Sequence, residues 1–62
     1  MAGRMRVLLA ESDRTLALAM TNKLRAGGVD VMTANDAAHA MNMARKERPD
    51  AIVMSERLAG GA

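Results

Sequence analysis

The amino-acid sequence predicts an α/β domain in which three parallel strands alternate with two helices. The segments at residues 6–10 and 51–54 are almost entirely apolar and are bounded by charged or polar residues, which is typical of strands buried on both faces of a parallel sheet. Segments with helical periodicity at residues 14–26 and 37–47 separate the strand-like segments. Because strand–helix–strand connections form right-handed crossovers, we expect the strands they join to be parallel.

The first strand is expected at residues 6–10, and the first helix follows at residues 14–26. Ser12 and Asp13 are suited to cap that helix, because their side chains accept bonds from free backbone N–H groups. Gly27 and Gly28 would end it, since glycine readily adopts positive φ. The predicted apolar face consists of Leu16, Ala17, Met20 and Leu24. The opposite face would carry Leu18, Thr21, Asn22 and Arg25.

Residues 29–33 alternate between apolar and polar types, which favours an edge or half-covered strand. Asn35 and Asp36 would cap a second helix at residues 37–47, which Pro49 stops. Its predicted apolar face consists of Ala37, Ala40, Met41 and Ala44. Residues 51–54 form the expected third strand, and residues 58–62 are typical of a loop or linker.

The composition limits the chain to one small domain that gains from a partner. It has 62 residues, no Cys, no aromatic residue and seven Met, so disulfides and large aromatic contacts are absent from its core. Small domains without such staples often gain stability by oligomerising. The net charge is only +2 and acids interleave with bases, so nucleic acid is an unfavoured partner. The sequence offers neither a membrane span nor a signal peptide, and we expect a cytoplasmic protein.

Three stretches together carry a resemblance to a known family. They are Val-Leu-Leu-Ala-Glu-Ser-Asp at residues 7–13, the entry to the second helix at residues 34–41, and Arg-Pro-Asp-Ala-Ile-Val-Met-Ser at residues 48–55. In order and spacing they resemble the N-terminal half of the receiver domain of bacterial response regulators, which is flavodoxin-like. The resemblance implies the strand order 2-1-3 and a single truncated receiver-like domain, with a core at residues 5–55 and a loop or linker at 56–62. Because Met1 starts the sequence and residues 58–62 are typical of a linker, we expect the N-terminal piece of a longer protein.

The residues that carry the family's chemistry are mostly replaced. The family holds Mg²⁺ with two adjacent acids after the first strand, and here that pair is Glu11 and Ser12, followed by Asp13. The family's phosphoacceptor aspartate falls on Ser55. The resemblance therefore implies a degenerate receiver without enzymatic activity or cofactor, in which Glu11 and Asp13 are weak vestigial metal candidates. A residual metal or phosphate site at Glu11, Asp13 and Ser55 competes with their simpler role as helix caps and strand ends.

The expected third strand, at residues 51–54, is interior in the resembled family but would lie at the edge of the three-stranded sheet here. Ile52, Val53 and Met54 would then form an apolar edge, which is a template for pairing with another chain. We therefore expect a symmetric homodimer, in which two third strands pair across a twofold axis or two copies exchange elements.

The remaining motifs favour structural roles. His39 is expected at the surface, because no other His, Cys or suitably placed acid supports a metal site with it. Basic residues at the end of the second helix complement its dipole, with phosphate contact as the alternative: Arg45, Lys46 and Arg48. Three methionines are expected to fill the core in preference to a binding groove: Met41, Met43 and Met54. Leu18 is expected either to be an isolated exposed residue or to contact a partner.

The sequence thus predicts a phosphorylation-independent half-receiver that mediates homodimerisation or binds another signalling protein in bacteria. The alternative is a Mg²⁺-binding or phosphorylation-regulated receiver whose site a partner chain completes. A small basic nucleic-acid binder is the third hypothesis, and salt-dependent binding would support it.

Overall fold

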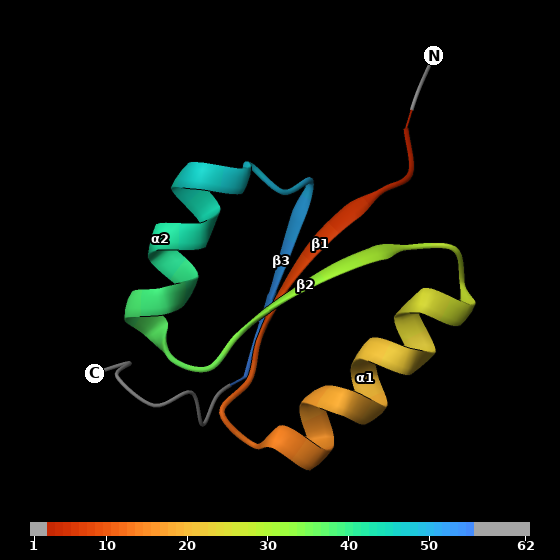
Figure 1. Cartoon of the computed structure of the whole chain (residues 1–62), viewed down its shortest axis with the longest axis horizontal. Coiled ribbons are helices and arrows are strands. Elements are labelled where there is room, and N and C mark those ends of the chain that lie inside the picture. Colours follow the sequence, from red (N-terminus) through yellow and green to blue (C-terminus); the bar gives the residue numbers. More distant parts are fainter. Residues whose placement is uncertain (1–2, 56–62) are drawn as a thin grey trace.

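A computed structural model describes residues 3–55 as one sheet with two helices (Figure 1). The elements are β1 (Arg6–Ala10), α1 (Arg14–Ala26), β2 (Asp30–Ala34), α2 (Ala37–Glu47) and β3 (Ala51–Met54). β1 pairs in parallel with both other strands, so the order is β2-β1-β3. The predicted fold class and strand order are confirmed. The loop or linker expected at residues 56–62 lies outside the described residues.

The core forms around the central strand β1. Leu8 and Ala10 are buried against Ala34 of β2 and Ala40 of α2. Partly buried apolar side chains complete this layer: Met32, Ala37, Met43 and Ala44. Val7 and Leu9 are buried as well, so the continuous apolar run in β1 is covered on both faces, as a central strand between two helices requires. α1 and α2 lie on opposite sides of the sheet (Figure 1).

The two ends of α1 are closed by the residues that the sequence predicts, but β2 begins one residue later than expected. Asp13 Oδ1 accepts a bond from the Leu16 N–H at 3.0 Å. Gly28 has φ +87°, and the Val29 N–H donates to the Leu24 carbonyl at 3.2 Å in a Schellman-type closure. Because this closure uses Val29, the strand starts at Asp30 instead of residue 29.

The buried face of α1 differs from the predicted one. Thr21 is only 6% exposed, whereas the prediction placed it on the outer side, and Leu16 is exposed. Thr21 lies four residues after Ala17 and three before Leu24, so it shares their face of the helix. The prediction was wrong because it traced the face from apolar residues alone.

α2 also packs with a different methionine from the predicted one. Met41 is exposed, and Met43 packs against the core with Ala40. At 100° per residue Met43 lies 60° from Ala40 on one side, whereas Met41 lies 100° away on the other, so the two cannot both face the sheet. Asp36 Oδ1 caps the helix by accepting the His39 N–H at 2.8 Å, as predicted. Neither helix in the described part of the chain has the length and apolar character needed to cross a membrane.

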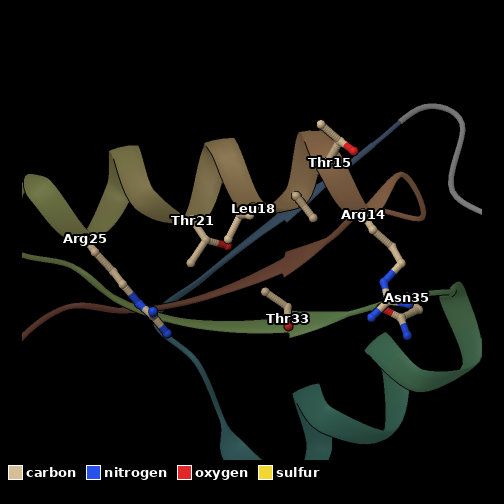
Figure 2. Close-up of a pocket in the computed structure, with 8 residues that line it drawn as sticks. Arg14, Thr15, Leu18, Thr21, Arg25, Thr33 and Asn35 are labelled. Carbon is tan, nitrogen blue, oxygen red and sulfur yellow. The ribbon is translucent and has the colours of Figure 1, made fainter.

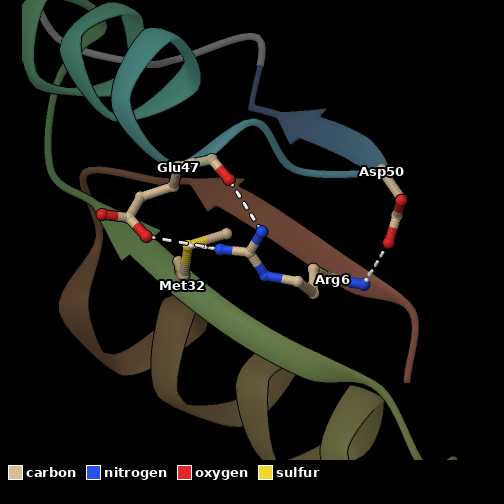
Figure 3. Close-up of polar contacts among 4 residues, drawn as sticks. All are labelled: Arg6, Met32, Glu47 and Asp50. Atoms are coloured by element: carbon tan, nitrogen blue, oxygen red, sulfur yellow. Dashed lines mark hydrogen bonds and ion pairs between the residues drawn. The ribbon is translucent and has the colours of Figure 1, made fainter. Parts of the chain in front are cut away.

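Arg6 ties three elements together at the amino end of the sheet (Figure 3). Its Nη1 donates to the Glu47 carbonyl at 2.7 Å, and its Nη2 lies 3.3 Å from Glu47 Oε1. The Arg6 N–H donates to Asp50 Oδ2 at 2.7 Å, and the Asp50 N–H donates to the Arg6 carbonyl at 2.8 Å. Because the ion pair is part-exposed, it contributes no more than about 1 kcal/mol. Its larger effect is to join the end of α2 and the start of β3 to β1.

Candidate functional site

The three strands end together at one edge of the sheet, and this brings Glu11 and Ser55 to the ends of neighbouring strands. The Ser55 N–H donates to the Ala10 carbonyl at 3.0 Å, and the Glu11 N–H donates to the Ala34 carbonyl at 3.1 Å. Glu11 therefore lies directly after β1 and Ser55 directly after β3. This is the edge where open α/β sheets bind ligands.

The carboxylates at this edge are engaged with the backbone. Glu11 is buried, and its Oε2 accepts the Asp13 N–H at 2.9 Å. Asp13 in turn uses Oδ1 to cap α1. Glu11 thus stabilises the turn that positions Asp13 as the cap of α1. Both acids therefore have the structural role, at a strand end and a helix cap, that is the simpler interpretation of the sequence.

This arrangement does not fit the requirements of Mg²⁺. Mg²⁺ favours octahedral coordination that includes carboxylate oxygens. Within residues 3–55 no group of three or more acidic or histidine side chains is placed to hold a metal ion. Ser55 supplies a hydroxyl at the position where the resemblance to the receiver family implies a carboxylate. No chemical step through a metal follows from these residues.

The second candidate region is β3, which is an edge strand because of the order β2-β1-β3. Ile52, Val53 and Met54 are 48%, 38% and 57% exposed, although all three are apolar. Fully buried strands have the same composition, and only the position at the edge distinguishes β3 from β1. The segment is thus an exposed apolar strand.

The two faces of β3 are exposed beside different helices. Ile52 pairs in register with Leu8 and Met54 with Ala10, so both lie on the α2 face of the sheet. Val53 pairs with Leu9 and lies on the α1 face. There it lines a mostly apolar hollow of about 220 Å³ together with Met20, Lys23 and Leu24.

The backbone of β3 presents hydrogen-bonding groups to its open side. The Ser55 N–H points to β1, where it reaches the Ala10 carbonyl. Because backbone polar groups alternate in direction along a strand, those of Val53 also point to β1 and those of Ile52 and Met54 point outward. An incoming strand would therefore meet the backbone of Ile52 and Met54.

The remaining predicted site residues are separate from this edge. His39, Arg45 and Lys46 are exposed on α2, where the basic pair occupies the last turn. The prediction missed Met20 and Leu24 as neighbours of β3, because it assigned them only to the core. The exposed Leu18 lies on another side of α1, at a second cavity described below.

These features define a class of structure, namely one βαβαβ half of a flavodoxin-like fold with an apolar strand at its edge. Comparison with known proteins finds similarity to bacterial response regulators. Response regulator MprA of Mycobacterium leprae is 36% identical over 50 residues, which cover 81% of this chain and 22% of that protein. Transcriptional regulatory protein PrrA of Mycobacterium tuberculosis is 41% identical over 49 residues, covering 79% and 21% respectively.

The resemblance to response regulators is therefore confirmed over about 50 residues of the chain. The same identity and coverage are found with PrrA of Mycobacterium bovis. No family model matches the chain. The chain spans about a fifth of the length of the curated relatives it matches, so it corresponds to a receiver-like segment of regulators that are much longer.

Proposed function

We propose that the chain is a half-receiver module that works by association and independently of phosphorylation, forming a homodimer through β3. The observation that carries this proposal is the exposure of Ile52, Val53 and Met54 on an edge strand. An apolar edge with open backbone groups is a template for strand pairing. Pairing with a second copy removes the edge from solvent.

The geometry of β3 suits a twofold axis perpendicular to the sheet at Val53. Two antiparallel copies would then place Ile52 opposite Met54 of the second copy, and the outward backbone groups of both residues would pair. A perpendicular axis keeps each face on the same side, so Ile52 and Met54 of the second copy would also pack side by side. The resulting sheet has the order 2-1-3-3′-1′-2′.

Strand pairing alone is a small interface, because stable dimers usually bury about 1,200 Å² or more. The hollow beside Val53, between α1 and β3, gives the second copy an apolar surface to pack against. A chain with no Cys and no aromatic residue has few other means of adding to its core. Both considerations support extension of the dimer contact from β3 to Met20 and Leu24 of α1.

Independence from phosphorylation is supported by the residues at the carboxyl edge of the sheet. Ser55 stands at the phosphoacceptor position of the resembled family, and Glu11 is committed to the backbone of the following turn. We assign the module no enzymatic activity and place it in bacterial signalling, which the names of its relatives support.

The first experiment measures solution mass by light scattering over a dilution series of the wild-type chain and the variant Met54→Pro. Proline at residue 54 removes an N–H that faces the open edge and leaves the bonds to β1 intact. Thr33→Pro is the matched control, because the Thr33 N–H faces the open side of β2. We expect twice the monomer mass for the wild type and for Thr33→Pro, and the monomer mass for Met54→Pro at concentrations where the wild type is still dimeric.

A wild-type monomer would refute the proposed dimer. A Met54→Pro protein that stays dimeric would refute pairing through β3 and favour exchange of elements between copies. Loss of the dimer in both proline variants would also refute it, because the effect would not be specific to β3.

The alternative, a Mg²⁺-binding or phosphorylation-regulated receiver, predicts a different response. We expect the amide NMR signals of Glu11, Asp13 and Ser55 to show no saturable shift with Mg²⁺, alone or with acetyl phosphate. A saturable shift at these three residues would contradict the interpretation of the chain as a degenerate receiver and support the alternative.

A further inference from the structure

A second cavity, of about 560 Å³, lies between α1 and β2 (Figure 2). It shares no lining residue with the hollow beside Val53. Two arginines line it, Arg14 at the start of α1 and Arg25 near its end, and Figure 2 shows both side chains extending from the helix toward the sheet. No acidic residue is among the described residues that line it. The volume is in the range of ligand sites in proteins.

The charges in this cavity are uncompensated within residues 3–55. The ion pairs in that part of the chain involve Arg4 and Arg6, and neither the Arg14 nor the Arg25 guanidinium group has a hydrogen bond or ion pair there. Thr21 also lines the cavity, and its buried Oγ1 lacks a hydrogen-bond partner among the same residues. Buried polar groups are normally satisfied, so the Thr21 hydroxyl points to a ligand that accepts hydrogen bonds. The guanidinium groups of Arg14 and Arg25 are exposed beside it and can pair with an anionic ligand.

The free edge of β2 borders the same cavity. The Asp30 N–H donates to the Met5 carbonyl, and the Ala34 carbonyl accepts from the Glu11 N–H, so residues 30 and 34 point to β1. By alternation along the strand, the N–H and C=O groups of Val31 and Thr33 point to the open side. The side chain of Thr33 lines the cavity. An added strand would therefore meet backbone partners beside the two arginines.

We propose that this cavity binds an extended acidic peptide segment, which adds to the edge of β2 and directs two carboxylates to Arg14 and Arg25. The proposal does not depend on the β3 dimer, because it uses the opposite edge of the sheet. Strand addition of this kind takes its affinity from main-chain bonds and its specificity from alternate side chains.

The spacing of the arginines sets the spacing of the acids. Arg14 and Arg25 are separated by a helix rise of about 16 Å. Along an extended peptide, residues four apart lie on the same face and are separated by about 13 Å. The flexible arginine side chains span the difference. Acids three apart would lie on opposite faces, and only one could reach the cavity.

The test measures fluorescence anisotropy with a labelled nine-residue peptide that has glutamates at its third and seventh positions and threonine or valine elsewhere. One control peptide has lysines at the same positions, and another has glutamates at the third and sixth. The protein variants are Arg14→Ala, Arg25→Ala and Thr33→Pro. Arg45→Ala is the matched control, because it removes an exposed arginine from α2 on the other face of the sheet.

We expect saturable binding of the first peptide only, weakened about three- to fivefold by Arg14→Ala or Arg25→Ala and changed less than about 1.5-fold by Arg45→Ala. Thr33→Pro should abolish it, and the bound peptide should slow hydrogen exchange of the Val31 and Thr33 amides. NMR spectra of each variant check that it is folded.

Three results would overturn the proposal. Equal binding of the lysine peptide, or an equal loss in Arg45→Ala, would show that Arg14 and Arg25 do not select the ligand. Equal binding of the peptide with glutamates three apart, together with unchanged exchange at Val31 and Thr33, would show that the ligand is not an added strand. Absence of saturable binding to the wild-type chain would remove the site altogether.

Discussion

The two edges of this sheet expose different chemistry although both strands pair with the same central strand. β2 exposes Asp30 and Thr33 and ends at the buried Ala34, whereas β3 exposes Ile52, Val53 and Met54 in succession. The start of β2 also carries an ion pair, since Arg4 Nε lies 3.4 Å from Asp30 Oδ1. Charged and polar residues at the edge of β2 disfavour pairing with apolar strands and leave that edge suited to a polar or charged partner, whereas β3 lacks such residues. The two edges therefore suit partners of different kinds.

We expect the largest effect on stability from a substitution in β1, the central strand that pairs with both edge strands. Leu8 is fully buried in β1, between β2 and β3. Leu8→Ala should lower the free energy of unfolding by about 3 kcal/mol, through lost burial and the cavity it leaves. Urea unfolding followed by circular dichroism measures this loss. Ile52→Ala at the exposed edge is the control and should cost the monomer much less; equal losses would mean that β3 is as well packed as β1.

Proline substitutions in β2 and β3 separate the functions of the two edges. Met54→Pro removes two of the backbone bonds in the proposed twofold pairing, so dimerisation should weaken about 30-fold at about 1 kcal/mol per bond. Its binding of the acidic peptide should stay unchanged. Thr33→Pro should show the reverse pattern in the same two measurements. If either variant lost both activities, the two edges would not act separately.

Thr21 tests the polar cavity beside β2. Thr21→Val replaces the buried hydroxyl, which has no hydrogen-bond partner among residues 3–55, with a methyl group of similar size. It should stabilise the free protein by about 1 kcal/mol. Thermal unfolding measures the change. The same substitution should weaken peptide binding, since the hydroxyl is then no longer available. A loss of stability would show that the hydroxyl is satisfied in the free protein.

The smallest effect is expected in the turns that lead into the two edge strands. The turn before β2 uses Gly28 at φ +87°, whereas the turn before β3 holds Arg48 at φ +49°. A non-glycine residue in this left-handed region is strained, so Arg48→Gly should stabilise the fold by about 0.5–1 kcal/mol. Chemical denaturation measures it, and Arg45→Gly inside α2 is the control that should destabilise. No gain at Arg48 would mean that its side chain compensates the strain.

Much of the fold could be predicted because the signals were local. The apolar run of β1, the Asp13 and Asp36 caps and the glycine closure of α1 depend on neighbouring residues, and the structure has each of them. The order β2-β1-β3 came from the family resemblance and is confirmed.

The errors concern the side that a helix turns to the sheet. Thr21 is buried in α1 and Met43 replaces Met41 against the core of α2, because helix rotation is set by what the sheet offers. A pattern of apolar residues cannot distinguish two orientations a few tens of degrees apart.

The features of the candidate site also fall into two groups, those predictable from the sequence and those that depend on the folded structure. The apolar character of β3 is a property of residue type and was readable from the sequence, whereas the assignment of Ser55 to the family's acceptor position is what the resemblance implies. Three other features became visible only in the folded chain: Glu11 accepts a bond from the Asp13 N–H, the backbone of Ile52 and Met54 faces outward, and Arg14 and Arg25 line one cavity. Each of these depends on directions and distances between elements, which packing of the two helices on the sheet fixes and residue type does not.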